Sequence, residues 1–95
     1  MKVLIEPEAE AEIEDAAAWY QQEAPGLGNA FIRAVQAAVA LLGRQPVIYA
    51  VAYGRVRRIH LRHFPWGLFY EIDTDQVAVV ACLHQHRDPQ DWPHN

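Results

Sequence analysis

Apolar and polar side chains alternate past Pro46, most clearly in the run Val56-Arg57-Arg58-Ile59-His60-Leu61-Arg62. A period of two residues is typical of a β-strand, whose successive side chains point to opposite faces of a sheet. We therefore expect Ile59 and Leu61 to face the core. Arg58, His60 and Arg62 then share the opposite face, as polar residues do on a half-buried antiparallel strand.

Two further strands are predicted after this run, at residues 66–73 and 77–84, with the turn Asp73-Thr74-Asp75-Gln76 between them. The first of the two carries large apolar residues on one side, at Trp66, Leu68, Tyr70 and Ile72. Three successive strands joined by short turns predict an antiparallel meander. For the remaining residues, 85–95, we expect irregular structure or a single helical turn.

Before Pro46 the sequence has a helical period. Residues 2–6 predict a short strand, which Pro7 ends. A first helix is expected from residue 8 to the run Ala24-Pro25-Gly26-Leu27-Gly28, and a second from about Asn29, its expected cap, to residue 43. Because so few residues connect them, the two helices should form an antiparallel hairpin.

Together these elements predict an α+β fold of two layers: an N-terminal strand, an antiparallel helix hairpin, and a three-stranded antiparallel meander whose apolar face the hairpin covers. The chain has 95 residues, of which 52 % are apolar and 21 % charged, as is typical of a globular protein. We expect residues 1–95 to form a single domain, because a second core would need roughly another 50 residues.

The sequence predicts neither a membrane span nor a secretory signal, so we expect a cytoplasmic protein. Its longest uninterrupted apolar run, residues 77–83, is far shorter than the ~20 residues that a membrane-spanning helix needs. The start Met1-Lys2-Val3-Leu4-Ile5-Glu6 turns acidic too soon for a secretory signal. The single cysteine, Cys82, lies in the apolar run and is expected to be a buried, inert thiol.

The net charge of −4 is unevenly distributed along the chain. Residues 1–54 carry three basic and seven acidic groups, whereas residues 55–95 carry five of each. Four arginines fall within residues 55–62, with His60 and His63 beside them. A local basic strip on an acidic protein argues against broad nucleic-acid binding, so we expect no stable direct binding of DNA by the chain alone.

Short elements along the chain resemble a known family. In order they are Trp19-Tyr20, Pro25-Gly26-Leu27-Gly28 with Phe31, Pro46, Val56-Arg57-Arg58, Phe64-Pro65, Tyr70, and His84 with Arg87-Asp88-Pro89 and Trp92. Their order and spacing are similar to those of the RelE/ParE superfamily of bacterial toxins over almost the whole chain. The resemblance implies the fold predicted above and a growth-inhibiting toxin of a type II toxin–antitoxin module, of the plasmid stabilisation type.

The resemblance also implies a partner, a cognate antitoxin of the ribbon-helix-helix or a similar DNA-binding type. Its C-terminal segment is expected to wrap across the helix hairpin and the sheet with helix-in-groove and strand-addition contacts. We expect Trp19 to meet this antitoxin. Glu12 and Asp15, from the acidic cluster of residues 8–15, would face basic residues of the partner.

Two main activities follow from the resemblance: RelE-like members cut messenger RNA on the ribosome, and ParE-like members poison DNA gyrase. Cutting RNA through its own 2′-hydroxyl needs a base, an acid and positive charge at the phosphate. If the chain is a nuclease, the catalytic candidates are Arg58, Arg62, His84 and Arg87. A histidine suits proton transfer at neutral pH, so this alternative stays open.

Inhibition of DNA gyrase is the favoured interpretation. The only lysine is Lys2, and the late aromatic residue is Trp92, whose indole is neither an acid nor a base. His84 followed by Arg87-Asp88-Pro89 and Trp92 is more similar to ParE-type members. The predicted target-binding residues are accordingly Arg58, Arg62, His84, Arg87 and Trp92. A third interpretation is a toxin-shaped protein with another target or with no activity beyond binding its antitoxin. The negative net charge motivates it, because it would repel ribosomal phosphates.

Several of these residues also have a purely structural interpretation. Arg58, His60 and Arg62 are equally the solvated side of an amphipathic strand. Arg57 shares the side of Ile59, and we expect its guanidinium to pair with Glu71 or Asp73. His84 and His86 have a spacing compatible with a metal, but no cysteine or carboxylate precedes them at ligand spacing, so no metal or cofactor is expected.

Overall fold

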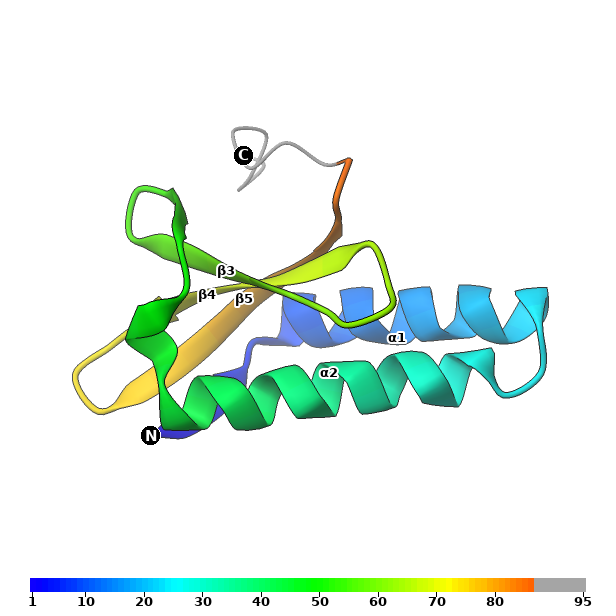
Figure 1. The fold of residues 1–95 in the computed structure, drawn as a ribbon, viewed down its shortest axis with the longest axis horizontal. Helices are drawn as coiled ribbons and strands as arrows, with labels where there is room; N and C mark the ends of the chain where they lie inside the picture. Colours follow the sequence, from blue (N-terminus) through cyan, green and yellow to red (C-terminus); the bar gives the residue numbers. More distant parts are fainter. Residues whose placement is uncertain (87–95) are drawn as a thin grey trace.

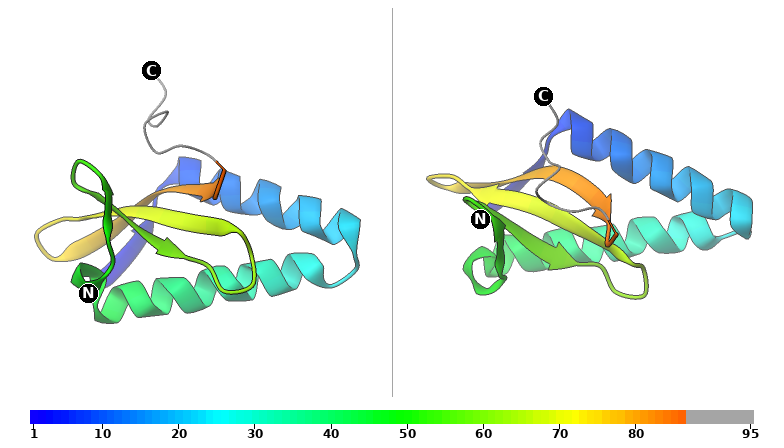
Figure 2. Two further views of the ribbon diagram at one scale, coloured as in Figure 1. Left: turned by 45° about the horizontal axis from the view of Figure 1, so that its top comes forward. Right: turned by 90° about the horizontal axis from the view of Figure 1, so that it is seen from above.

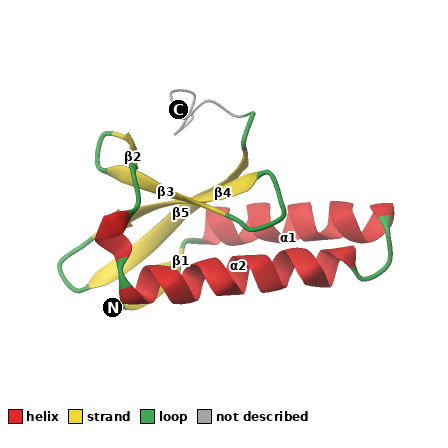
Figure 3. Ribbon diagram, viewed as in Figure 1, coloured by secondary structure: helices red, strands yellow, loops and turns green. Residues whose placement is uncertain are grey.

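The computed structural model describes residues 1–86. Its elements follow the order β1 (Lys2–Ile5), α1 (Pro7–Glu23), α2 (Leu27–Arg44), the short 3₁₀ helix η1 (Pro46–Ile48), β2 (Val51–Tyr53), β3 (Val56–His60), β4 (Trp66–Ile72) and β5 (Gln76–His84). The antiparallel helices α1 and α2 form one layer and the sheet forms the other (Figures 1, 2 and 3). The predicted two-layer α+β fold is therefore confirmed.

The sheet is mixed rather than purely antiparallel. Within the described residues its strand order is β1-β5-β4-β3-β2. β3, β4 and β5 form the predicted antiparallel meander. β1 lies beside β5 and pairs with it in parallel, from Lys2↔Gln76 to Ile5↔Val79. The first and last strands of the described chain are thus neighbours.

β2 is a strand that the sequence did not predict. It has three residues and an irregular register with β3, so it is too short for an alternating pattern to reveal it. The connection to β3 is the two-residue turn Gly54-Arg55, in which Gly54 has a φ of 57°. Tight hairpin turns favour glycine at such left-handed positions. The meander therefore extends by one edge strand.

The main core lies between the helices and the sheet. Its buried side chains come from both layers and include Phe31, Val35 and Leu42 of α2 and Ile59, Leu61, Leu68, Tyr70, Val77 and Val79 of the sheet region. Ile59 and Leu61 face this core, as predicted. Among residues 1–86, Tyr70 is the largest fully buried side chain, and its hydroxyl donates a 2.6 Å hydrogen bond to the carbonyl of Pro46.

A β-bulge in β5 decides which of its side chains face the helices. Tyr70 pairs with Val79 but Phe69 pairs with Ala81, so Val80 is one residue more than β4 can match. An extra residue reverses the alternation beyond it. Val79 lies in the main core, and the next residue on that side is Cys82 rather than Ala81.

The face of the sheet opposite the helices carries a second, smaller apolar cluster of Val56, Phe69, Ala81 and Leu83. The sequence predicted a polar face here, and it is only partly polar because the middle of β4 is apolar on both sides. The Arg58 guanidinium carbon lies 5.8 Å from the centroid of the Phe69 ring. The stem of Arg58 also crosses Gly67, where an added Cβ would lie 3.1 Å from its Cγ.

Arg57 does not pair with Glu71 or Asp73, and this expectation was wrong. Its guanidinium donates to the backbone carbonyls of Val47, at 3.1 Å, and Tyr49, at 2.7 Å. The segment between α2 and β2 passes over the start of β3 on the helix side, and its carbonyls need donors. Arg57 therefore ties this segment to the sheet.

α2 begins at Leu27, two residues before the expected cap Asn29. Gly26 is the N-cap residue of α2 and adopts a φ of 87°. As a glycine it has no side chain to cap the helix. Instead the Gln21 Oε1 of α1 accepts from the backbone N–H groups of Gly26, at 3.1 Å, and Gly28, at 3.2 Å. A side chain of the first helix thus caps the second one.

The two helices lie in close contact at Gly28, so a methyl group added there should be costly. A Cβ at Gly28 would lie 2.7 Å from the carbonyl oxygen of Ala17. We expect Gly28→Ala to lower the free energy of unfolding by about 1–3 kcal/mol, despite the better helix propensity of alanine. Urea denaturation measures this loss. Gln36→Ala, at an exposed position of α2, is the control and should change stability by less than about 0.5 kcal/mol. Equal midpoints for both variants would contradict the close contact.

Candidate functional site

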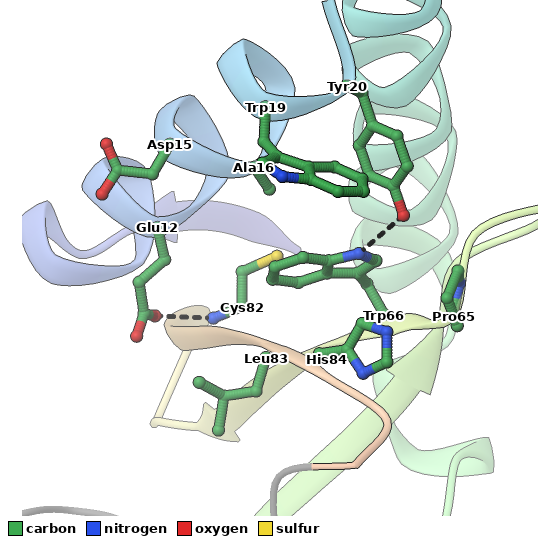
Figure 4. A pocket seen from close by; sticks show the side chains of 10 residues that line it. All are labelled: Glu12, Asp15, Ala16, Trp19, Tyr20, Pro65, Trp66, Cys82, Leu83 and His84. Carbon is green, nitrogen blue, oxygen red and sulfur yellow. Dashed lines mark hydrogen bonds between the residues drawn. The ribbon is translucent and has the colours of Figure 1, made fainter. Parts of the chain in front are cut away.

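A groove with a volume of about 690 Å³ lies between α1, the start of β4 and the end of β5. Its lining residues are Glu12, Asp15, Ala16, Trp19, Tyr20, Pro65, Trp66, Cys82, Leu83 and His84 (Figure 4). Most of these side chains are apolar or aromatic, and the two carboxylates both belong to α1. In Figure 4 the rings of Trp19, Tyr20 and Trp66 lie close together, the Glu12 carboxylate reaches the backbone nitrogen of Cys82, and Asp15 points away from the rings.

A series of aromatic rings crosses the groove and ties the helices to the sheet. Tyr20 of α1 stacks on Phe31 of α2 with 5.3 Å between centroids, and its hydroxyl accepts a 3.0 Å hydrogen bond from Trp66 Nε1. Trp66 in turn meets the His84 ring edge to face at 5.5 Å. Edge-to-face contacts at such distances stabilise a fixed arrangement. The floor of the groove is therefore fixed by packing and by a hydrogen bond.

Trp19 lies at the upper side of the groove and is 56 % exposed. Its ring contacts Tyr20 edge to face at 5.0 Å. Since large exposed aromatic side chains are enriched at binding surfaces, this ring is a candidate contact for a partner.

The carboxylate of Glu12 takes the place of a strand partner at the edge of β5. β1 pairs with β5 only as far as Val79, whose carbonyl accepts from the N–H of Glu6. Further along the same edge, the N–H of Cys82 donates 2.8 Å to Glu12 Oε1. A side chain from α1 thus satisfies a backbone donor that a longer β1 would otherwise have met.

Cys82 is buried at this edge, as the sequence predicted. Burial, followed by the negative charge of Glu12, raises the pKa of its thiol to about 12. Because the thiolate is the nucleophilic form, the thiol is inert at neutral pH.

Three residues predicted to contact an antitoxin lie together in the groove. Glu12, Asp15 and Trp19 come from successive turns of α1 and share one of its faces, which the groove opens to. Their roles remain predictions, but the structure brings them into one place.

The residues predicted to contact the target do not share one surface. Arg58 lies on the face opposite the helices, over Phe69. His84 lies on the helix side in the groove, because the bulge in β5 turns it there. Arg62 is exposed in the connection between β3 and β4. The remaining two, Arg87 and Trp92, lie outside the described residues.

His84 and His86 come together at the end of β5. Their ring centroids are 4.9 Å apart, and the backbone N–H of His86 donates to His84 Nδ1 at 3.2 Å. Within residues 1–86, no group of three or more histidine, cysteine or acidic side chains has the geometry to hold a metal ion.

In the same part of the chain, no helix is long and apolar enough to span a membrane.

Sequence reasoning missed the contribution of Tyr20 and Trp66 to the groove. Both side chains are partly buried against the core. Their meeting depends on the strand register, which places Trp66 opposite His84. No local pattern carries that information.

Alkaline pH should destabilise the protein through Cys82. The thiol ionises near pH 9.0 in the unfolded chain but only at a pKa of about 12 in the folded one, so the unfolded state loses the proton first. We expect the free energy of unfolding to fall by about 1.4 kcal/mol per pH unit in that interval from this group. Denaturant melts across the interval measure the slope.

Cys82→Ala should remove this slope. Burial also raises the pKa of Tyr70 from 10.0 to about 12, against the lowering effect of Arg57, so a second decline that begins above pH 10 should remain in the variant. Identical alkaline slopes for the two proteins would contradict the assignment to Cys82.

Comparison with known proteins identifies the family. A family model described as the ParE toxin of the type II toxin–antitoxin system parDE matches residues 3–89. No curated protein sequence matches the chain. Among solved structures, a chain of the chromosomal ParDE TA system from P. aeruginosa has the same fold, with a TM-score of 0.79 and 14 % sequence identity over 88 % of this chain and 95 % of that one. Since the family model spans nearly the whole sequence, the chain belongs to the ParE toxin family of type II toxin–antitoxin systems.

Proposed function

We propose that this protein arrests growth by binding DNA gyrase and that its cognate antitoxin neutralises it. Membership of the ParE toxin family supports the toxin role and implies an antitoxin as partner. The proposal takes residues 1–95 as one domain that acts in the cytoplasm, where gyrase acts on DNA.

The separation of Arg58 from His84 is the observation that carries this proposal. A ribonuclease needs its base, its acid and its cationic group within hydrogen-bond reach of one phosphate. Arg58 lies on one face of the sheet and His84 on the other, and Arg62 lies in an exposed connection. Among residues 1–86 these candidates form no common site, which favours inhibition by surface contact over RNA cleavage.

We assign target contact to residues on both sides of the sheet: Arg58 on the face opposite the helices, Arg62 in the connection between β3 and β4, and His84 in the groove on the helix side. Arg87 and Trp92 complete the proposed set. Arg58 suits an interface, because its stem is held over Gly67 and Phe69 and its guanidinium loses little freedom on binding. The antitoxin contact falls to Trp19, Glu12 and Asp15, which line the groove on the other side of the molecule's sheet.

Two assays with purified protein separate gyrase inhibition from RNA cleavage. With gyrase and supercoiled plasmid, the protein should stabilise cleavage complexes, measured as linear DNA after detergent and protease treatment. In a translating extract it should leave messages intact. Messages cut within codons, without gyrase cleavage complexes, would overturn the proposal in favour of a ribosome-dependent nuclease. Silence in both assays would leave a protein that only binds its antitoxin.

Removal of two arginines should abolish toxicity. We expect cells that express the Arg58→Ala/Arg87→Ala variant to grow at the uninduced rate, because both proposed target contacts are lost. Circular dichroism of the purified variant should show an intact fold. Arg33→Ala/Arg44→Ala removes the same charge from exposed positions of α2 and should remain toxic. Full growth arrest by the Arg58→Ala/Arg87→Ala variant would refute the assignment.

A further inference from the structure

We propose that the protein forms a weak two-fold dimer, in which the edge strand β2 of one copy pairs antiparallel with β2 of a second copy. The contact surface is the neutral segment, which we define as residues 45–54 and which comprises η1, β2 and the residues beside them. This inference does not depend on which target the toxin binds.

The neutral segment differs in charge from the rest of the chain. It contains no acidic residue and no lysine, arginine or histidine, whereas the whole chain has a net charge of −4. An excess of charge of one sign keeps copies of a protein apart. The neutral segment is therefore a surface through which two copies can meet without placing like charges opposite each other.

The other edge of the sheet is charged. Among the residues that the structure describes, β1 and β2 are the outer strands. β1 begins with Lys2 and is followed by Glu6, and beyond its end the Glu12 carboxylate occupies the edge of β5. Natural proteins protect strand edges with charged side chains, and β2 has none. Pairing between copies is thus favoured at β2.

Exposed apolar side chains are concentrated in the neutral segment. Val47, Ile48, Val51 and Tyr53 are 64, 61, 54 and 48 % exposed, respectively. They are half of the large apolar residues that are exposed in the described part of the chain. A second copy that covers them would remove this apolar surface from water.

The neutral segment is held in shape by the rest of the fold. The Arg57 guanidinium donates to the carbonyls of Val47 and Tyr49. The Tyr70 hydroxyl donates to the carbonyl of Pro46. A surface that is already ordered loses little conformational freedom on association, which favours binding.

The backbone of Val51 points toward the free side of β2. The N–H of Arg58 donates 3.1 Å to the carbonyl of Ala50, so these two residues lie opposite each other and are hydrogen-bonded. Val51, the next residue, pairs with Arg57. Since successive residues of an antiparallel strand point their backbone groups to alternate sides, the N–H and C=O of Val51 point away from β3.

A two-fold axis at Val51 matches this edge to itself. Each Val51 would lie opposite Val51 of the second copy, and each N–H would donate to the carbonyl of the other. The same register would place Tyr53 opposite Tyr49 of the second copy. Because Val51 shares the side of Arg57, which holds η1, the Val51 side chains and η1 of both copies would lie on one side of the joined sheets.

The contact is small and leaves the groove beside α1 open. β2 has three residues, so few backbone hydrogen bonds can form and the dimer belongs among the weak interfaces. In Figure 3, β2 lies at the upper left, away from both helices. The strand order places it at the other edge of the sheet from β5, which lines the groove.

Sedimentation velocity of the purified full-length chain tests self-association. Between about 1 µM and about 300 µM protein we expect a monomer–dimer equilibrium with a Kd of about 10–100 µM. Val51→Lys places like charges opposite each other at the axis and should weaken the dimer at least about ten-fold. A wild-type chain that stays monomeric over this range would overturn the proposal.

Leu4→Lys is the matched control, because Leu4 is an exposed apolar residue of the other outer strand, β1. It should leave the Kd of the dimer unchanged, and urea melts of both variants check that each is folded. Equal weakening by Leu4→Lys and Val51→Lys would overturn the assignment of the contact to β2.

Salt dependence tests the apolar character of the contact. Arg44 and Arg55 flank the neutral segment, so charge at its margins opposes the dimer. Raising the sodium chloride concentration from about 50 mM to about 500 mM should therefore leave the Kd unchanged or lower it, because salt screens this repulsion. A dimer that salt dissociates would be held by ion pairs, contrary to the proposal.

Cross-linking tests the two-fold register. Directly opposed, hydrogen-bonded residues of antiparallel strands have Cα atoms about 5.5 Å apart, within the range that a disulfide spans. Val51→Cys should therefore form a disulfide-linked dimer under copper phenanthroline, whereas Leu4→Cys should not. The native Cys82 is buried and does not compete. A dimer in which residue 51 fails to cross-link would exclude this register.

Growth assays distinguish a second copy from other occupants of the neutral segment. Val51→Lys should still arrest growth and should still be neutralised by the antitoxin, because Val51 is not among the residues assigned to either contact. If the wild type is monomeric and Val51→Lys loses toxicity or escapes neutralisation, the segment serves the target or the antitoxin and the proposal fails. A dimer that does not inhibit gyrase would overturn the proposed function and leave this inference standing.

Discussion

The antiparallel pairing of β4 with β5 is the constraint on which the rest of the structure depends. It is the longest pairing in the described sheet, and it runs from Trp66↔His84 to Ile72↔Val77. The bulge at Val80 divides this pairing into two parts. In β5, odd-numbered side chains face the helices before the bulge and even-numbered ones after it. One half supplies Val77 and Val79 to the core, and the other turns His84 toward α1. A site beside α1 exists because this one residue is inserted.

Much of the fold could be predicted from the sequence, because it is encoded in local periods. Helical spacing, alternation and the glycine-rich break between the helices indicated the hairpin and the three strands of the meander. β2 escaped because three residues are too few to establish a period. The parallel partner of β1 escaped because the pairing joins residues more than 70 positions apart, for which a single sequence offers no local signal.

The candidate site was harder to predict for the same reason. Glu12, Asp15 and Trp19 lie together because they share one face of a helix, which helical geometry alone brings about, and their antitoxin role stays a prediction. Arg58 and His84 were both predicted to contact the target, but they lie on opposite faces of the sheet, because the bulge in β5 turns His84 toward the helices. Arg57 was assigned an acidic partner, whereas it binds carbonyls of a segment whose path depends on the tertiary structure. Predictions from the local geometry of a helix were reliable, whereas the pairing register of the strands could not be predicted.

The carboxylate at the edge of β5 has a consequence for how the protein behaves among copies of itself. Uncovered strand edges invite aggregation, and natural proteins protect them with charge. Here the guarding group is Glu12, on a helix whose charged side chains are all acidic. Two copies that approach through this edge would bring like charges together, whereas a partner of opposite sign would not meet this barrier. Among residues 1–86, the edge therefore carries a charge that disfavours pairing between two copies.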